Sequence, residues 1–426
     1  MEFRRITALL LSCLLLAVSC KKDDSASSSD DGKADYTLTQ AKSAKRGVSF
    51  SFGQIPEYDV PLLQSAITWS YDWSSRVPIE TVDREFTKYG LDWCPMIWNG
   101  NYNPDNIRQY KQKHPEAKYI LAFNEPNLTD QANMVPSKAA EYWPAVVSLA
   151  KELGMKIISP ALNYGTLEGY HDPIKWMDEF LAQPGVSLDD MDGIALHCYM
   201  PSASSVKKFI DMFAKYGKPI WLTEFCNGNS NNISEEAQLV YMCETLNMLE
   251  AHPNVFRYAW FMPRGGFNSR WHNNLLTSES PFELTTLGKV FVHFPTLDKN
   301  IWYKAGDVIP AEQYVYAEGS ILLEPSTDGG VLDIFKLSQG GSVEYQIDMA
   351  SAGTYSVAIR YLTYMESSLG FAVNGETVAS KKIPNTEKQW KTSTLKLDLP
   401  AGKSTLRLTG QSGAAIRLNW LRIKNN

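Results

Sequence analysis

The sequence predicts two folded domains: an α/β domain built as a (β/α)8 TIM barrel, followed by an all-β jelly-roll sandwich. With 426 residues the chain is long enough for two or more domains. From residue 46 to 298, short apolar runs alternate with stretches of helical period, which indicates parallel strands joined by helices. Beyond residue 300 the pattern changes to short strands separated by glycine-containing turns, which is typical of a sandwich.

Eight apolar runs are the candidate strands of the barrel. Most are nearly continuous rather than alternating, as expected of a parallel sheet that is covered on both faces. They are residues 47–52, 66–71, 91–98, 119–124, 156–161, 193–199, 219–225 and 256–261. The length of 46–298 is close to the roughly 250 residues of a typical (β/α)8 barrel. A doubly wound open sheet is the alternative, but no GxGxxG motif follows the first strand.

The clearest helices lie at 137–153 and 234–250. Ser137 and Ser234 are candidate N-caps, and Gly154 is a candidate C-terminal stop. Residues 299–308 are expected to form a connector, and 309–426 the sandwich. Its candidate strands include 343–347, 354–361, 394–397 and 405–408, separated by turn pairs such as Asn374-Gly375.

The first 19 residues predict a processing signal. Arg4 and Arg5 precede an apolar run, 6–18, that is too short to span a bilayer. With Cys20, this segment resembles a bacterial lipoprotein signal, which implies that Cys20 is lipidated and begins the mature protein. The segment KKDD at 21–24 resembles the surface-export signal of Bacteroidota lipoproteins. We expect residues 20–45 to be a lipidated, flexible tether and the protein to be anchored at the outer membrane or cell surface of a Gram-negative bacterium. Plain secretion is the alternative.

The charge balance excludes some classes of partner. Lys and Arg number 41 against 47 Asp and Glu, so the net charge is −6. A nucleic-acid binder would carry a strongly basic surface, and adsorption to anionic lipid would need a basic patch. The lipid anchor is therefore the only membrane contact that we expect. We also expect a monomer.

Four cysteines remain after processing: Cys94, Cys198, Cys226 and Cys243. Four cysteines allow three disulfide connectivities, and the sequence does not choose among them. Because most of them lie in apolar, strand-like segments, we expect buried free thiols. No CxxC spacing is present, which argues against a zinc ribbon. No metal ion or cofactor is predicted for the chemistry.

Two carboxylates are expected at one mouth of the barrel. In a (β/α)8 barrel the reactive groups lie at the carboxyl ends of the strands. Glu125 follows the end of the fourth candidate strand, and Glu224 is the second-last residue of the seventh. Paired carboxylates can hydrolyse a glycosidic bond, one as the acid and the other as the attacking group. Aromatic side chains can stack on sugar rings. The candidate substrate-binding residues at the same mouth are His197, Tyr199, Trp98 and Trp260.

At these positions the sequence resembles glycoside hydrolase family 128. The matching segments are WCPMIWNG at 93–100, LAFNEPNLTDQANM at 121–134, SKAAEYWP at 137–144, SPALN at 159–163, DGIALHCY at 192–199, KPIWLTEF at 218–225 and RYAWF at 257–261. The resemblance implies a retaining enzyme that acts on β-1,3-glucans, with Glu125 as the acid/base and Glu224 as the nucleophile. It also implies that Asn124 binds the sugar 2-hydroxyl and that His197 or Tyr199 orients Glu224.

The C-terminal domain resembles carbohydrate-binding module family 6. The matching pieces are PAE at 310–312, GTY at 353–355, RY at 360–361, LPAG at 399–402 and LNW at 418–420. In that family the segment that corresponds to 385–392 commonly carries two Trp, and here only Trp390 remains. Arg417 stands where a sugar-contacting Asn is often found. Sugar binding by this domain, at this face or another, is therefore left open.

Functions other than that of a retaining β-1,3-glucanase are also compatible with the sequence. The chain could act on a glucan of another linkage, because the loops that form the subsites set specificity. It could also be a non-catalytic surface glycan-binding protein, or a structural adhesion protein with an inert groove. The presence of both Glu125 and Glu224 favours an enzyme.

Overall fold

The computed structural model describes residues 38–426 except 231, 266 and 267. The predicted signal segment, Cys20 and the first part of the predicted tether lie outside these residues. The described residues all belong to one compact unit. Within this part of the chain, no helix is both long and apolar enough to cross a membrane.

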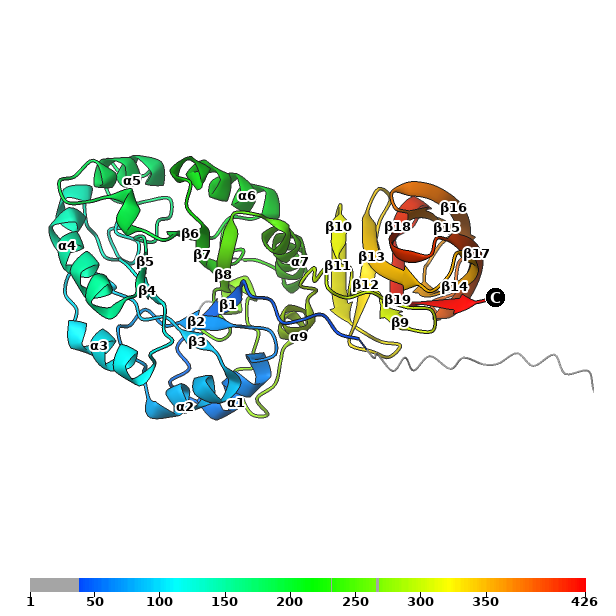
Figure 1. Cartoon of the computed structure of the whole chain (residues 1–426), viewed down its shortest axis with the longest axis horizontal. Helices are drawn as coiled ribbons and strands as arrows, with labels where there is room; N and C mark the ends of the chain where they lie inside the picture. The colour runs from blue at the N-terminus through cyan, green and yellow to red at the C-terminus, as the bar shows by residue number, and fades with distance from the viewer. Residues whose placement is uncertain (1–37, 231, 266–267) are drawn as a thin grey trace, which may run out of the picture. The chain divides into compact units, whose positions relative to one another are not determined.

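The N-terminal part is an α/β domain with parallel strands (Figure 1). Six strands form one sheet in the order β3-β2-β1-β8-β7-β6, and two form a second sheet, β4-β5. Their bounds are β1 Arg46–Ser49, β2 Trp69–Tyr71, β3 Asp92–Trp93, β4 Tyr119–Leu121, β5 Lys156–Ile158, β6 Ile194–Cys198, β7 Ile220–Phe225 and β8 Val255–Trp260. Each predicted run overlaps one of these strands, and β1 and β8 each begin one residue before the predicted run. Isolated parallel bridges join Met96 to Leu121 and Ile158 to Gly193, between the two sheets.

Helices follow the strands, and in Figure 1 α2 to α7 lie around the outside of β1 to β8. The helices are α1 Pro56–Leu63, α2 Glu80–Tyr89, α3 Pro104–Lys113, α4 Pro136–Leu153, α5 Pro173–Leu181, α6 Ala203–Met212, α7 Glu235–Ala251, α8 Asn268–Trp271 and α9 Thr286–His293. The cap Ser234 is confirmed, since its side chain accepts from the Ala237 N–H. Gly154 ends α4 in the left-handed region, as predicted. The Ser137 cap is wrong: Pro136 already occupies the first turn, because proline needs no N–H partner there.

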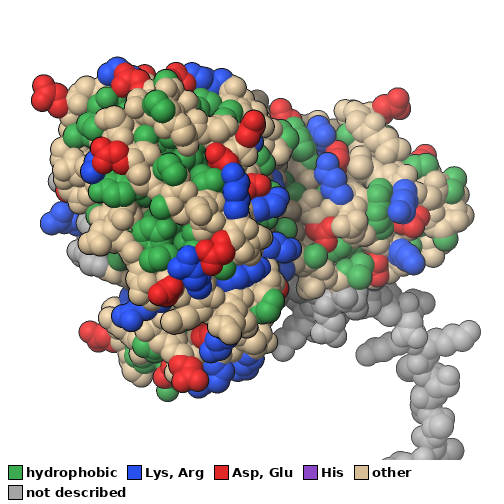
Figure 2. All heavy atoms as spheres, turned by 60° about the vertical axis from the view of Figure 1, so that its left-hand side comes forward, with side chains coloured by type: hydrophobic (Ala, Val, Ile, Leu, Met, Phe, Trp, Pro, Cys, Tyr) green, Lys and Arg blue, Asp and Glu red, His purple; other side chains and the backbone are tan. Residues whose placement is uncertain are grey.

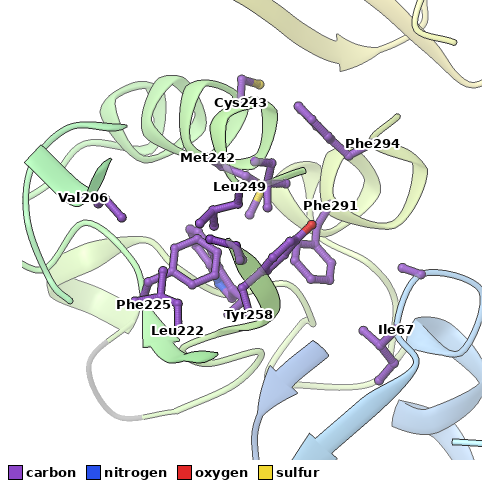
Figure 3. Packing of buried hydrophobic residues seen from close by; sticks show 14 of the residues in the cluster. Ile67, Val206, Leu222, Phe225, Met242, Cys243, Leu249, Tyr258, Phe291 and Phe294 are labelled. Atoms are coloured by element: carbon purple, nitrogen blue, oxygen red, sulfur yellow. The ribbon is translucent and has the colours of Figure 1, made fainter. Parts of the chain in front are cut away.

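Large side chains fill the space between the strands and the helices. Met242 and Leu249 of α7 and Phe291 of α9 pack toward Tyr258 and Phe225, on β8 and β7 (Figure 3). The four cysteines are buried and free, as expected. This packing holds β7 and β8 in place, and with them the carboxyl ends that carry the predicted site.

The C-terminal part is all-β and antiparallel. One sheet has the order β10-β13-β18-β15-β16 and the other β11-β12-β19-β14-β17, with β9 paired to β19. Their bounds are β9 Val308–Pro310, β10 Tyr316–Glu318, β11 Ile321–Pro325, β12 Leu332–Leu337, β13 Ser342–Met349, β14 Gly353–Leu362, β15 Ser367–Val373, β16 Glu376–Ile383, β17 Lys391–Leu399, β18 Gly402–Gly413 and β19 Ile416–Asn425. The predicted turn at Asn374-Gly375 joins β15 to β16, and both residues have positive φ, as a two-residue hairpin loop requires.

The α/β and all-β parts pack against each other. Tyr314 Oη donates to Asn247 Oδ1 on α7 at 2.9 Å, and Ser320 Oγ donates to Glu244 Oε1 at 2.8 Å. Side chains of both parts belong to one continuous hydrophobic cluster. The sandwich is therefore packed on the helices α7 and α9 rather than joined only by the connector.

The prediction of a flexible tether up to residue 45 is wrong for its last part. Lys45 Nζ donates to the carbonyls of Leu249, Glu250 and His252 at 2.8–3.1 Å, so it caps the carboxyl end of α7. Gln40 Nε2 donates to the Tyr314 carbonyl at 2.9 Å. The polar composition suggested mobility, but these side chains instead satisfy backbone groups of the folded body.

The charged side chains are mixed on the surface. On the face shown in Figure 2, Lys and Arg lie among Asp and Glu.

Candidate active site

Glu125 and Glu224 lie at the carboxyl ends of parallel strands. Glu224 is in β7, and Glu125 follows β4 in the segment Asn-Glu-Pro. Glu125 has φ +44, a region that costs a non-glycine residue energy and that is often found at functional sites. Both side chains are almost fully buried. The two sheets thus bring together carboxylates that are far apart in the sequence.

His197 lies between the two carboxylates. Its Nδ1 is 3.0 Å from Glu125 Oε1 and 3.4 Å from Glu224 Oε2. One oxygen of each carboxylate and one nitrogen of the ring all lie within 4.8 Å of one another. His197 is fully buried, and its strand β6 pairs with β7 so that His197 and Glu224 are register partners.

Three side chains donate hydrogen bonds to Glu224. Tyr71 Oη donates to Oε1 at 2.9 Å and Trp73 Nε1 donates to the same oxygen at 2.7 Å. Tyr199 Oη donates to the other oxygen, Oε2. Hydrogen bonds to a carboxylate favour its ionised form. This arrangement fixes the orientation of Glu224 and supports a negative charge on it.

Glu125 has fewer donors. Asn163 Nδ2 donates to Glu125 Oε1 at 3.3 Å. The preceding residue, Asn124, donates its Nδ2 to Gln131 Oε1 at 3.0 Å. In the described residues the buried Asn124 Oδ1 has no hydrogen-bond partner. Because such an atom is costly when unpaired, it is suited to accept a hydrogen bond from a bound hydroxyl.

The electrostatics couple the three groups. Burial disfavours the charged form of His197, but the charges of Glu224 and Glu125 outweigh it and raise the pKa of His197. Burial also favours neutral Glu125, yet the neighbouring His197 outweighs this effect and the pKa of Glu125 is lowered. For Glu224, burial raises the pKa, and the charge of Glu125 adds to this while His197 opposes it. The two carboxylates and the imidazole therefore exchange protons as a unit.

The structure brings most of the predicted site residues together. Glu125, Glu224, His197 and Tyr199 are in contact, and Asn124 is adjacent. Trp98 is half-buried and packs against the same cluster as Trp73, and its carbonyl accepts from the Asn124 N–H. The Trp73 indole therefore lies beside Glu224, and the backbone of Trp98 lies beside Asn124.

Trp260 is not part of this group. It is fully buried, and its Nε1 donates to the Asn273 carbonyl at 2.9 Å. Its ring packs on Phe225, Tyr241 and Phe291, between β8 and the helices. Successive side chains of a strand point to opposite faces, and Trp260 points away from the site. The expectation that it contacts substrate is corrected accordingly.

Sequence reasoning missed Tyr71, Trp73, Asn163 and Gln131. Tyr71 ends β2 and Trp73 follows two residues later, so the rule for strand ends could have found both. Asn163 is the last residue of the SPALN segment, after β5. Gln131 lies in the loop between β4 and α4, where no pattern distinguishes it from its neighbours.

In the sandwich, Trp390 and Arg417 lie together. The guanidinium of Arg417 is 5.7 Å from the centre of the Trp390 ring, and Arg417 also pairs with Glu324. Trp390 Nε1 donates to Thr327 Oγ1 at 3.1 Å. The position that the resemblance associates with a sugar-contacting Asn is thus held by an ion pair of the domain itself.

Comparisons with known proteins identify the families of the two parts. The family profile described as glycosyl hydrolase catalytic core matches residues 49–291, which is more than half of the chain. The chain belongs to this family. The profile of carbohydrate binding module (family 6) matches residues 310–425, which form the antiparallel part.

The fold of this chain is similar to those of two solved glucanase structures. An endo-β-1,3-glucanase of family 128, subgroup II, from Pseudomonas viridiflava is 35% identical with a TM-score of 0.54, covering 59% of this chain and 98% of its own. A subgroup II endo-β-1,3-glucanase from Sorangium cellulosum is 30% identical with a TM-score of 0.50, covering 58% and 97%.

A curated relative is the alkali-sensitive linkage protein 1 of Schizosaccharomyces pombe. It is 27% identical over 257 residues, which are 59% of this chain. The match spans 44% of that relative, so the present chain corresponds to less than half of its length.

Proposed function

We propose that this chain is a retaining glycoside hydrolase that cleaves β-1,3-glucan by double displacement. The observation that carries the proposal is the close approach of Glu125 and Glu224 around His197, within 4.8 Å. Retaining glycosidases hold their carboxyl groups about 5–5.5 Å apart, whereas inverting enzymes leave about 6.5–9.5 Å for a water molecule. The short approach favours direct attack of a carboxylate on the sugar.

The hydrogen bonds assign the two roles. Glu224 is the nucleophile, because donors on both of its oxygens stabilise a carboxylate and aim it. Glu125 is the acid/base that protonates the leaving oxygen and then activates water. The assignment rests on hydrogen-bond geometry, because the protons of Glu125, Glu224 and His197 belong to the three groups together. A bound sugar changes the surroundings of all three.

Neighbouring side chains position the sugar. The free Oδ1 of Asn124 accepts a hydrogen bond from the 2-hydroxyl of the ring that is attacked. Such a bond can strengthen as positive charge develops on the ring. Trp73 donates to Glu224, and the half-buried Trp98 pairs through its backbone with Asn124. Both rings are candidates for flat apolar surfaces on which sugar rings stack.

The substrate proposal is supported by the comparisons, since both solved structures above are named endo-β-1,3-glucanases. We also propose that the strands of the α/β part close into a (β/α)8 barrel. It is supported by the pairing of β1 with β8 and by the bridges Met96–Leu121 and Ile158–Gly193 between the sheets.

The proposal also assigns functions to the C-terminal sandwich and to the N-terminal lipid anchor. The match to a carbohydrate-binding module supports retention on polysaccharide, through a surface other than the one Arg417 occupies. We further propose that Cys20 carries lipid and holds a monomeric enzyme at the cell surface. This part rests on the sequence alone, and a mass measurement of the N-terminal peptide from membranes tests it.

The deciding experiment incubates the protein with linear β-1,3-glucan, beside Glu224→Gln, and separates the products by size. NMR of the fresh products reports the anomeric configuration. The wild type should release β-configured products and the variant none, while the variant still binds glucan. Products of inverted configuration would contradict the mechanism.

Two other results would redirect the assignment. Glucan binding without products from either protein would favour the capture protein. Neither binding nor cleavage would overturn the substrate, and other β-glucans would then be tested.

A further inference from the structure

One fully buried side chain of α7 is polar although it lies on a face of the helix that packs apolar residues. Gln238 is fully buried and lies about one helical turn before Met242. Met242 and Leu249 of the same helix pack toward β7 and β8 (Figure 3). Burial of an amide costs free energy unless its polar atoms form hydrogen bonds. The partners of Gln238 therefore explain why a polar residue occupies this position.

Both polar atoms of the Gln238 amide are paired with backbone groups of two loops. Oε1 accepts from the Asn227 N–H at 3.1 Å, and Nε2 donates to the Asn227 carbonyl at 3.1 Å. Nε2 also donates to the Trp271 carbonyl at 2.6 Å. Asn227 lies just after β7, and Trp271 ends α8, which follows β8. Gln238 thus ties together the segments that follow two neighbouring strands.

Both of these segments contact Tyr199. Next to Asn227, the Gly228 N–H donates to the Tyr199 carbonyl at 3.4 Å. The ring centres of Trp271 and Tyr199 are 5.7 Å apart. A Cβ at Gly228 would lie 3.1 Å from the Trp271 ring and 3.2 Å from Tyr199 Cβ, so the glycine lets the three residues pack closely. One segment therefore holds the backbone of Tyr199, and the other holds its ring.

The position of the Tyr199 ring decides where its hydroxyl points. Tyr199 Oη donates to Glu224 Oε2. A hydrogen bond weakens steeply as its donor loses alignment, and small displacements of reacting groups can slow an enzyme strongly. A residue that fixes Tyr199 therefore acts on Glu224 without touching it.

We propose that Gln238 is a positioning residue of the active site, which braces the segments after β7 and β8 and thereby holds the Tyr199 hydroxyl on Glu224. The consequence for catalysis rests on the proposed function, in which Glu224 is the nucleophile. The bracing of the two segments does not rest on it. A purely structural Gln238 would change the stability of the protein and leave the chemistry of a folded variant as it is.

Hydrogen exchange read by mass spectrometry tests the bracing without any substrate. Gln238→Met keeps the approximate size of the side chain and removes its hydrogen bonds. The Asn227 amide loses its acceptor, so peptides that cover residues 225–230 should exchange about fivefold faster or more. Unchanged exchange of these peptides in a folded variant would overturn the proposal. Where Gln238→Met does not fold, the isosteric Gln238→Glu takes its place.

Gln346→Met is the matched control. Gln346 is also buried, and its Nε2 donates to the Lys299 carbonyl at 3.1 Å, but it lies in the antiparallel part of the chain. This variant should lose stability in thermal melts and leave exchange at residues 225–230 as in the wild type. Faster exchange there in both variants would show a general loosening and contradict a specific brace.

Kinetics on linear β-1,3-glucan test the positioning role. Gln238→Met should lower kcat by about 10-fold or more and change KM by less than about twofold, because the Tyr199 hydroxyl acts on the nucleophile. Gln346→Met should keep the kcat of the wild type. If Gln238→Met changes only the melting temperature, its role is structural and the positioning role is refuted.

A double-mutant cycle identifies the route. In the Tyr199→Phe background, Gln238→Met should lower kcat by less than about twofold, since the hydroxyl that Gln238 positions is already gone. An equal fall of kcat in both backgrounds would show that Gln238 does not act through Tyr199. If the wild type cleaves no glucan while exchange at residues 225–230 still depends on Gln238, the bracing stands and the proposed function falls.

Discussion

His197 and Glu224 are register partners on β6 and β7, and the ladder shifts register between Leu196 and His197. An irregularity of this kind re-aims the side chains that follow it. Here the shift accompanies the placement of His197 Nδ1 within reach of both Glu224 and Glu125. The backbone of two neighbouring strands therefore positions the group that couples the carboxylates.

Removing a donor to Glu224 should slow the reaction without abolishing binding. Hydrogen bonds to charged groups contribute about 1.5–3 kcal/mol, so Trp73→Phe and Tyr199→Phe should each lower kcat by roughly 10- to 150-fold. Tyr164→Phe is the control, because the Tyr164 hydroxyl donates to the Met212 sulfur and not to Glu224. A kcat within twofold of wild type for both donors would contradict their role.

Asn124→Ala should lose the contact to the sugar 2-hydroxyl. We expect kcat/KM to fall by about 10- to 100-fold on an ordinary substrate. On a substrate whose reacting ring lacks the 2-hydroxyl, wild type and variant should differ little. An equal loss on both substrates would show that Asn124 acts on the fold of the loop instead.

Trp98 and Trp260 should respond differently to truncation. Trp98→Ala removes a half-buried ring from a residue whose backbone pairs with Asn124, and we expect it to raise KM more than it lowers thermal stability. Trp260→Ala leaves a cavity in the packed core and should cost about 3–5 kcal/mol of unfolding free energy. Calorimetry and kinetics on both variants check this. A stable Trp260 variant with raised KM would restore the original expectation for this residue.

Asp72 should make stability depend on pH. Burial raises its pKa to about 6, against the hydrogen bonds from Ser74 that lower it. The folded pKa lies above the unfolded one, so this contribution to stability is complete below pH ~4 and is lost as pH rises through 6. Compared with Asp72→Asn, the wild type should become progressively less stable over this interval in thermal melts.

The control for Asp72 has the opposite sign. Burial of Asp178 is outweighed by hydrogen bonds from Lys215 and Tyr216, and its pKa is lowered. Compared with Asp178→Asn, the wild type should lose stability as pH falls below 4, with a small effect because Asp178 is half exposed. Parallel pH curves for the two variants would contradict both assignments.

Deletion of residues 310–426 should destabilise the α/β part. The cut removes the Tyr314–Asn247 hydrogen bond and exposes apolar residues of α7 and α9. We expect the truncated chain to melt at a lower temperature and to lose activity on oligosaccharides as well as on insoluble glucan. Full activity on oligosaccharides with an unchanged melting temperature would show that the two parts fold independently.

Much of the fold could be predicted because the signals were local. Apolar runs marked each parallel strand, and Ser234 and Gly154 marked helix ends through their own chemistry. Ser137 failed as a cap because the preceding proline took the first turn. The last part of the tether failed because Lys45 and Gln40 bind backbone groups more than 200 residues away, which composition does not encode.

Site residues could be predicted where their position at the end of a strand places them in the site. They could not be predicted where the direction of the side chain decides whether it reaches the site. Glu125 and Glu224 follow from their positions on the strands. Trp260 lies near the end of β8, but successive side chains of a strand point to opposite faces, and the side chain of Trp260 points into the core. Contacts between neighbouring strands are equally hard to predict from the sequence, as Gly47 shows. A Cβ at Gly47 would lie 2.5 Å from Trp69 Nε1, so the glycine on one strand makes room for the indole on the next.

The cap that Lys45 makes on α7 fixes where the polypeptide enters the α/β domain. Arg46 begins β1, so entry is at the amino ends of the parallel strands, while Glu125 and Glu224 lie at the opposite, carboxyl ends. The described chain therefore enters the α/β domain at the end opposite to the two candidate catalytic carboxylates. A force applied at Lys45 would consequently act on the amino ends of the strands, far from the carboxyl ends that hold Glu125 and Glu224.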